Sequence, residues 1–499
     1  MKKWNSFYEY VKFPITIVFL AYITKSIGSF ILSVNLAKLY TFDFTLIYDI
    51  AIIAVNLANV LIFFWPLITA AYMLSKKYSA TVPGILSVVS YFLIIVVMSY
   101  VMIGTNAFTN GYINLFNNST IALFGSSVLV SIVVYIVVNF AYKRSLNRSN
   151  YTLFNFMHRN SWALMFTLFL SSIASAILVY IWPIFMSSIN YVFTFISQDI
   201  TNPVGLFFYG ILDRVFSLFN SRELIVDNFL YGISGGSWIN AAGETFTGDI
   251  PIWTAQSAAN LFNTGAGRFI TPYYLLQLFA IPGVLIAFSA KTTNKIERRK
   301  VITLTILAII ISLFGNTLLP LELLMIVAFP TLYIAHLLIS GVLFGLLQAM
   351  GVFIGFTSTY RGYNSVGNIL DLMINYSNTN LTNSINTLLI LGVFVLILYF
   401  VITIVFINNF SIDPLKTGRK KLVIDDLIEL LGGIDNITHC SSTPFKIIVT
   451  LKESNLVDFH FLNRVDVYKV TEGKNHYNLF MGIRSFVVCK EINKLKDRY

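Results

Sequence analysis

The stretch GNTLLPLELLMIVAFPTLYIAH, from Gly315 to His336, is apolar enough to cross a membrane, yet it contains residues that interrupt a membrane helix. Two prolines, Pro320 and Pro330, flank a single carboxylate, Glu322. Proline removes a helical hydrogen bond, and a carboxylate at bilayer depth is costly and usually functional. The stretch therefore predicts a broken membrane segment that directs Glu322 into a cavity inside the protein. The alternative is a structural carboxylate that accepts hydrogen bonds from backbone amides of a hairpin.

Composition places most of the chain in a membrane. Of the 499 residues, 56% are hydrophobic and 11% are charged, whereas soluble domains carry about 25% charged residues. The net charge of +11 would suit nucleic acid. The basic residues, however, occur in short clusters between apolar segments, as determinants of membrane topology do. We therefore expect no nucleic-acid partner.

Nine apolar segments have the length that a membrane helix needs. They lie at 13–34, 50–75, 82–104, 121–142, 162–186, 268–290, 300–316, 321–350 and 384–409. A shorter run at 203–219 is a candidate interfacial segment. Counting broken hairpins, we expect an all-α polytopic membrane protein of about 10 membrane segments.

The distribution of charge predicts the orientation of these segments. Basic clusters flank alternate segments, and the loop at 105–120 has no charged residue. Because cytoplasmic loops carry the excess of Lys and Arg, we expect the N-terminus, the loop at 291–300 and the C-terminal region in the cytoplasm. The first apolar segment is too long for a signal peptide and lacks a clear cleavage site, so we expect it to be retained.

Residues 220–267 form a second unusual segment. They are polar and Gly-rich, and they carry Asp249 and Glu244. Long loops of this kind are either functional or disordered, and the aromatic residues in this one favour order. Two broken elements in the second half of a transporter-like chain indicate a substrate site.

The composition changes after Lys421, which predicts a small α/β domain. KLVIDDLIELLGG reads as an amphipathic helix that Gly432-Gly433 ends, and FKIIVTL reads as a β-strand. A short helix near 454–463, strands near 465–470 and 477–483, and a charged C-terminal helix follow. We therefore divide the chain into a membrane domain at 1–415 and a cytoplasmic domain at 416–499. The two cysteines, Cys440 and Cys489, lie in this second part and indicate neither a disulfide framework nor a metal site. We expect no metal and no cofactor.

Several motifs, in a consistent order, resemble the glucose-type sugar permeases of the phosphotransferase system. In this family a membrane component (IIC) precedes a phosphocarrier domain (IIB). The matching stretches are IGSFI at 27–31, IWP at 181–183, FFYGILDRVF at 207–216, GDI at 248–250, AGRF at 266–269 and LIELLGGIDNIT at 427–438. The opening stretch resembles the family signature G-I-T-E-P-I-E-F…A-P…L-Y-x-x-H, with which Pro320, Glu322, Pro330, Tyr333 and His336 align without gaps. The resemblance covers nearly the whole chain.

The resemblance implies a bacterial cytoplasmic-membrane protein, homodimeric, that takes up a sugar by phosphoenolpyruvate-dependent phosphotransfer. A separate IIA-type phosphocarrier is then an expected partner. The substrate-binding residues would be Arg214, Glu322, Arg222 and Asp249. A carboxylate accepts hydrogen bonds from sugar hydroxyls or acts as a base, and arginine offers a fork of donors that suits phosphate. For His336 a structural hydrogen bond is the favoured interpretation.

The chain departs from the family pattern in the membrane part. Leu319 occupies the position of the signature's first glutamate, which in the family contacts the sugar, and leucine cannot accept a hydrogen bond from a hydroxyl. Arg222 and Glu223 replace the two histidines of the family's G-L-H-H motif. Arg214 itself is retained.

The tail departs from the family pattern as well. The phosphocysteine motif D-A-C-I-T-R-L-R aligns without gaps with SSTPFKII at 441–448, which places Thr443 at the cysteine position. Cys440 lies three residues earlier, so either Cys440 or Thr443 is the candidate phosphocarrier residue. Phosphotransferase activity therefore stays open. The alternative function is a diverged paralogue that acts as a non-phosphorylating permease or as a membrane sensor.

Overall fold

The computed structural model describes most of the chain. The described residues are 2–32, 45–103, 108–109, 112–113, 127–146, 159–262, 265–292, 295–315, 318, 322–323, 325–326, 330–355, 367, 369–409, 417–443, 446–457, 462–465, 467, 469–473, 476–481 and 484–497. The expected outside loop at 105–120 and the family positions Leu319 and Pro320 fall largely or wholly outside these residues.

The protein is a mostly helical, multi-pass membrane protein. Among the described residues, seven helices are long and apolar enough to cross a membrane: Phe13–Ile31, Leu46–Tyr78, Val128–Ser145, Asn160–Gln198, Thr271–Lys291, Pro330–Ala349 and Thr382–Asn408. These correspond to seven of the nine expected segments. The segment expected at 82–104 forms helix α4 (Val82–Ile103), but its apolar stretch, Val82–Met98, is too short to be included among the seven. The segment expected at 300–316 lies within α13 (Lys295–Gly315), which is not among the seven either. The total of about 10 segments therefore stays a prediction.

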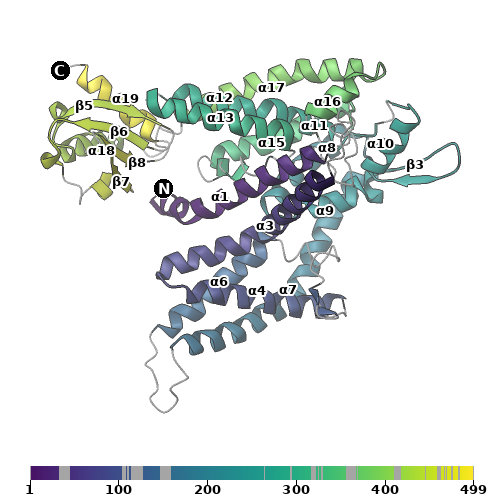
Figure 1. The fold of residues 1–499 in the computed structure, drawn as a ribbon, viewed down its shortest axis with the longest axis horizontal. Helices are drawn as coiled ribbons and strands as arrows, with labels where there is room; N and C mark the ends of the chain where they lie inside the picture. The colour runs from purple at the N-terminus through teal and green to yellow at the C-terminus, as the bar shows by residue number, and fades with distance from the viewer. Residues whose placement is uncertain are drawn as a thin grey trace, which may run out of the picture.

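The helices of the first half pack against one another and lie together in Figure 1. Their bounds are α1 Lys2–Ile31, α3 Thr45–Tyr78, α4 Val82–Ile103, α6 Val128–Ser145 and α7 Arg159–Gln198. Contacts join α1 with α3 and join α4 and α6 with α7. A core around Tyr91, Val134 and Trp182 fills the space between them. Only 17% of the apolar stretch of α7 is buried in the protein, as expected for a helix whose remaining surface faces lipid.

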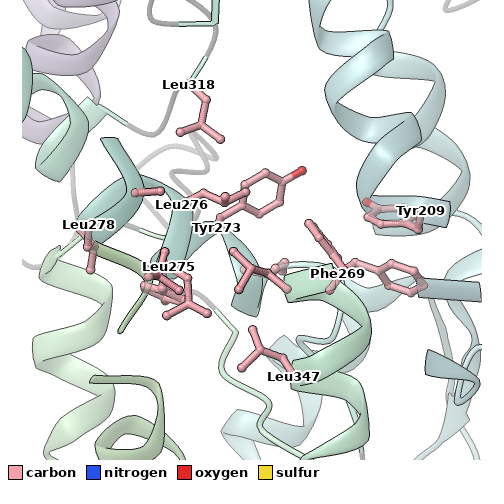
Figure 2. Packing of buried hydrophobic residues seen from close by; sticks show 14 of the residues in the cluster. Tyr209, Phe269, Tyr273, Leu275, Leu276, Leu278, Leu318 and Leu347 are labelled. Atoms are coloured by element: carbon pink, nitrogen blue, oxygen red, sulfur yellow. The ribbon is translucent and has the colours of Figure 1, made fainter. Parts of the chain in front are cut away.

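The second half surrounds one buried central helix. Its helices are α8 Pro203–Leu218, α11 Thr271–Leu275, α12 Ile281–Lys291, α13 Lys295–Gly315, α15 Pro330–Ala349, α16 Ile369–Tyr376 and α17 Thr382–Asn409, with a π-helical turn at Leu276–Ala280 that joins α11 to α12. The stretch Thr271–Lys291 is 83% buried. Figure 2 shows part of the apolar core here, where the rings of Tyr209 and Phe269 lie 4.6 Å apart. The largest core of the molecule therefore lies in the half that carries the broken elements.

Residues 220–262 are ordered, as their aromatic content predicts. They contain α9 (Glu223–Ile225), a π-helical turn (Val226–Leu230), the antiparallel hairpin β3–β4 (Ser237–Ile239 and Thr245–Thr247) and α10 (Asp249–Ala258). In Figure 1 this hairpin projects from the end of the molecule opposite the C-terminal sheet.

The C-terminal region contains a four-stranded antiparallel sheet and two helices, α18 and α19, that contact each other. Its elements are α18 Thr417–Leu430, β5 Ile437–Ser442, β6 Lys446–Leu451, β7 Lys469–Glu472, β8 Tyr477–Phe480 and α19 Arg484–Lys496, and the strand order is β5-β6-β8-β7. The first helix, the strand at β6 and the last helix occur where the sequence predicts them. Strand β5 was not expected, and the described part of 454–463 forms two 3-10 turns instead of a helix. The boundary at 415/416 stays a prediction, because 410–416 lie outside the described residues.

Candidate functional site

Close packing of α8 against α15 brings the charged residues of the site together. Gly341 and Gly345 lie four residues apart on α15, the spacing that allows membrane helices to approach closely. A Cβ atom at Gly341 would lie 2.7 Å from the carbonyl oxygen of Phe207, and one at Gly345 would lie 2.8 Å from that of Pro203. Only glycine fits at these two contacts. The Tyr333 hydroxyl of α15 then donates a hydrogen bond to the carbonyl of Arg214 on α8, at 3.1 Å.

Glu322 lies at the centre of a buried polar network. Its Oε1 atom accepts a hydrogen bond from Nη1 of Arg214 at 3.1 Å and lies 3.1 Å from Nε2 of His336. Nδ1 of His336 lies 2.8 Å from the hydroxyl of Tyr399. A neutral imidazole with its proton on Nε2 satisfies both contacts, since Nε2 then donates to the carboxylate and Nδ1 accepts from the tyrosine. His336 therefore holds the carboxylate in place, in agreement with the structural role favoured for it.

Asp213 extends the network to a second arginine. Its carboxylate forms an ion pair with Arg214, and Oδ1 also accepts a hydrogen bond from Nε of Arg222 at 3.1 Å. Nη2 of Arg222 donates to the hydroxyl of Tyr273 at 2.8 Å. Both guanidinium carbons lie 5.1 Å from the centroid of the Tyr273 ring, within cation–π range. The Arg222 side chain is 35% exposed and that of Asp213 is 0% exposed. The network therefore runs from an accessible arginine to a buried carboxylate.

The charges of this network balance, but some of the buried polar atoms in and near it lack a hydrogen-bond partner. Two arginines face two carboxylates, the pairing that buried charges need. Oε2 of Glu322 nevertheless has no hydrogen-bond partner among the described residues, and neither has the buried hydroxyl of Tyr209. A buried polar atom without a partner costs about 1–3 kcal/mol. A polar ligand that bonded to these two atoms would remove this cost.

Asp249 does not join the network in the described structure. It is buried at the start of α10, where Oδ1 accepts from the amide of Gly267 at 2.8 Å and Oδ2 from the amide of Phe269 at 3.2 Å. These bonds fasten the AGRF turn to the segment at 220–262. Glu244, at the exposed end of the β3–β4 hairpin, accepts a hydrogen bond from Asn240 at 2.7 Å. The positions of both carboxylates are those of structural residues.

Neither candidate phosphocarrier residue is exposed. Cys440 is 3% exposed on β5, and its Sγ lies 3.0 Å from Sγ of Cys489 on α19. The hydrogen bond to Cys489, together with burial, raises the pKa of the Cys440 thiol. Thr443 is 4% exposed at the turn between β5 and β6, where its amide donates to the carbonyl of Lys446 at 2.9 Å. The described residues on either side of Thr443 thus belong to paired antiparallel strands, with Ser441 opposite Ile448 and Ser442 opposite Ile447.

Sequence reasoning identified part of the network and missed part of it. It selected Arg214, Glu322 and Arg222, which the structure connects, and it did not select Asp213 or Tyr273. A carboxylate beside an arginine inside an apolar helix was the available signal for Asp213. Tyr273 offered no such signal, because a tyrosine in an apolar segment is usually part of the core. Among the described residues, no group of three or more His, Cys, Asp or Glu side chains could hold a metal ion.

Comparisons with known proteins agree with the sequence motifs. No protein-family model matches the chain. The chain is similar to a curated protein, the PTS system glucoside-specific EIICBA component of Staphylococcus carnosus (strain TM300), with 25% identity over 338 residues. The match covers 65% of this chain and 46% of that protein, so the chain spans about half the length of its relative. The resemblance is therefore confirmed: the chain is similar to a glucoside-specific component of the phosphotransferase system.

Proposed function

We propose that the protein takes up a sugar across the bacterial cytoplasmic membrane as a permease of the phosphotransferase system. The observation that carries this proposal is the difference in bonding between the two carboxylate oxygens of Glu322. One carboxylate oxygen is held by Arg214 and His336, and the other lacks a partner among the described residues although the residue is 1% exposed. A carboxylate fixed in this way accepts a hydrogen bond from a sugar hydroxyl without first rearranging.

The rest of the network suits a ligand that is rich in hydroxyl groups. Because each carboxylate already faces an arginine, the site has no excess of charge that would require a charged ligand. Oε2 of Glu322 offers an acceptor and the hydroxyl of Tyr209 offers a donor or an acceptor. The ring of Tyr273 lies within 5.1 Å of both guanidinium carbons and supplies an apolar surface beside them.

The relationship to a phosphotransferase-system component supports the wider assignment. In this proposal 1–415 form the IIC-like permease domain and 416–499 a IIB-like domain in the cytoplasm. The protein acts as a homodimer and meets a separate IIA-type phosphocarrier. Arg214, Glu322 and Arg222 belong to the sugar site, whereas Asp249 supports the adjoining turn.

Uptake without phosphorylation is the second candidate function. The burial of Cys440 and the hairpin at Thr443 favour it, because neither residue is presented to a phosphoryl donor. The similarity to a transport-system component does not favour a sensor that lacks transport.

Uptake into proteoliposomes that contain the purified protein tests the proposal. The probes are radiolabelled glucose and methyl glucoside, and phosphoenolpyruvate with the general phosphocarriers and a IIA-type phosphocarrier is supplied on the C-terminal side. Accumulation of sugar phosphate supports the phosphotransferase permease, and accumulation of unmodified sugar supports the second candidate. If neither sugar binds or enters while the protein is folded, the assignment is wrong for this substrate class.

A further inference from the structure

The two cysteines of the chain lie side by side, although 49 positions separate them. Sγ of Cys440 on β5 lies 3.0 Å from Sγ of Cys489 on α19, and both residues are 3% exposed. Both thiols are free. A disulfide requires a sulfur–sulfur distance of about 2.05 Å, so a small movement of one side chain would bring the two atoms into bonding contact.

The surroundings of the pair distinguish the two sulfurs. Cys440 donates its S–H to Sγ of Cys489, and the side-chain amide of Asn493 lies 3.8 Å from the same Cys489 atom. Asn493 also donates to the carbonyl of Cys440 at 3.1 Å. Two donors directed at one sulfur favour its thiolate form, which is the nucleophile in thiol chemistry. Cys489 is therefore the attacking sulfur and Cys440 the resolving one.

We propose that Cys440 and Cys489 are a thiol–disulfide site that a small peroxide oxidises. The Cys489 thiolate attacks one peroxide oxygen and the O–O bond breaks. The departing hydroxide takes up the proton that Cys489 released and leaves as water. The Cys440 sulfur then attacks the resulting sulfenic sulfur, the S–O bond breaks, and a second water leaves with the Cys440 proton. Two thiols and one hydrogen peroxide become one disulfide and two waters. A dithiol reductant reverses the reaction.

The position of the bond gives oxidation a structural consequence. It would join the C-terminal helix α19 to the edge strand β5 of the sheet. Helix α19 also contacts α17, and Phe486 on α19 packs against the large core of the membrane part. The same helix therefore contacts both the sheet and the membrane helices, and the disulfide would hold it in this place.

Peptide mapping of the full-length protein tests the proposal directly. The purified protein in detergent is treated with hydrogen peroxide, alkylated under denaturing conditions and digested with trypsin. The sequence predicts that Cys440 is released in the peptide 422–446 and Cys489 in the peptide 485–490. Because the chain has only two cysteines, a cross-linked pair of these peptides identifies the bond. The bond lies within one chain if the undigested protein migrates as a monomer in non-reducing electrophoresis.

Cys440→Ser and Cys489→Ser are the matched variants. We expect the wild type to lose both thiols and to regain both with dithiothreitol. The Cys440→Ser variant should instead accumulate irreversible sulfinic acid at Cys489, because the resolving thiol is absent. Retention of both thiols in the wild type, sulfinic acid on either cysteine in place of the cross-link, or a covalent dimer would overturn the proposal. None of these readouts depends on sugar transport, so they are independent of the proposed function.

Discussion

Nη1 of Arg214 lies 3.1 Å from Oε1 of Glu322, across 108 positions of sequence. The arginine is on α8, and the carboxylate lies between α13 and α15, in the stretch that Pro320 and Pro330 flank. Tertiary packing alone brings them together, and the second carboxylate oxygen has no hydrogen-bond partner among the described residues.

Removing either partner of this contact should weaken sugar binding. We expect Glu322→Gln and Arg214→Ala to lose about 1–3 kcal/mol of binding free energy, which is roughly a tenfold to hundredfold loss of affinity. Equilibrium binding of radiolabelled methyl glucoside to purified protein measures the effect. Glu244→Gln is the matched control, because that carboxylate is exposed at the β3–β4 hairpin. Unchanged affinity in both site variants would place the sugar elsewhere.

Asp213→Asn should destabilise the membrane part of the protein. The change leaves Arg214 and Arg222 without the carboxylate that lies between them, and breaking a buried ion pair from one side costs about 3–5 kcal/mol. We expect a lower thermal unfolding midpoint in detergent. The exposed Asp199 provides the comparison: its carboxylate contacts Thr201 in a loop, and Asp199→Asn should shift the midpoint far less. Equal midpoints for the two variants would show that the buried pair contributes little.

The C-terminal sheet should face the cytoplasm and the β3–β4 hairpin the outside. Nζ of Lys76, at the end of α3, lies 5.3 Å from the ring of Tyr10 near the N-terminus, and Lys291, at the end of α12, donates to Asn408 of α17 at 2.8 Å. The basic ends of α3 and α12 thus lie beside the N-terminal part of α1 and the end of α17. Because cytoplasmic loops carry the excess of Lys and Arg, we expect this end of the molecule to face the cytoplasm.

Labelling of single cysteines tests this orientation. In a Cys440→Ala, Cys489→Ala background, we expect an impermeant maleimide to label Ala241→Cys in intact cells. The same reagent should label Glu472→Cys only after permeabilisation. Both positions are exposed in the structure, so a difference reports the side of the membrane. Labelling of Glu472→Cys in intact cells would reverse the orientation and remove the basis for a cytoplasmic phosphocarrier domain.

Under the second candidate function, uptake without phosphorylation, phosphoryl transfer through the C-terminal region should be absent or strongly impaired. The raised pKa of Cys440 keeps the thiol protonated near neutral pH, and the thiol is a much weaker nucleophile than the thiolate. Thr443 would need an adjacent base to attack, and its Oγ1 instead accepts a hydrogen bond from the Lys446 amide at 3.2 Å. We expect no label on the tail from radiolabelled phosphoenolpyruvate with the general phosphocarriers.

Two variants identify the residue if label does appear. Label that disappears only in Cys440→Ser, together with formation of sugar phosphate, would show that Cys440 has taken over as phosphocarrier. Label that disappears only in Thr443→Ala would assign the role to the threonine. Either result contradicts the expectation that the tail does not transfer phosphate.

The sequence alone determined the class of the protein and much of its organisation. Long apolar segments are a local property, since each must be long enough to cross the bilayer by itself. The breaks predicted around Glu322 rest on a local signal for the same reason, because proline and a buried carboxylate act on the segment that contains them. The motifs from 207–216 and 315–336 also carried the resemblance to the phosphotransferase system, which 25% identity over 338 residues confirms.

Only the tertiary structure decided which of these residues act together. Arg214, Arg222 and Glu322 could be chosen from residue type and position in the family motifs, but Asp213 and Tyr273 enter the site through the close crossing of α8 with α15 and the buried course of α11. Asp249 illustrates the reverse case, since its partners are backbone amides that no side-chain pattern reports. The spacing of Cys440 and Cys489 indicates no pairing, yet packing of α19 on β5 brings their sulfurs to 3.0 Å. Spacing along a chain reports contacts within one element, whereas contacts between elements depend on how their faces pack.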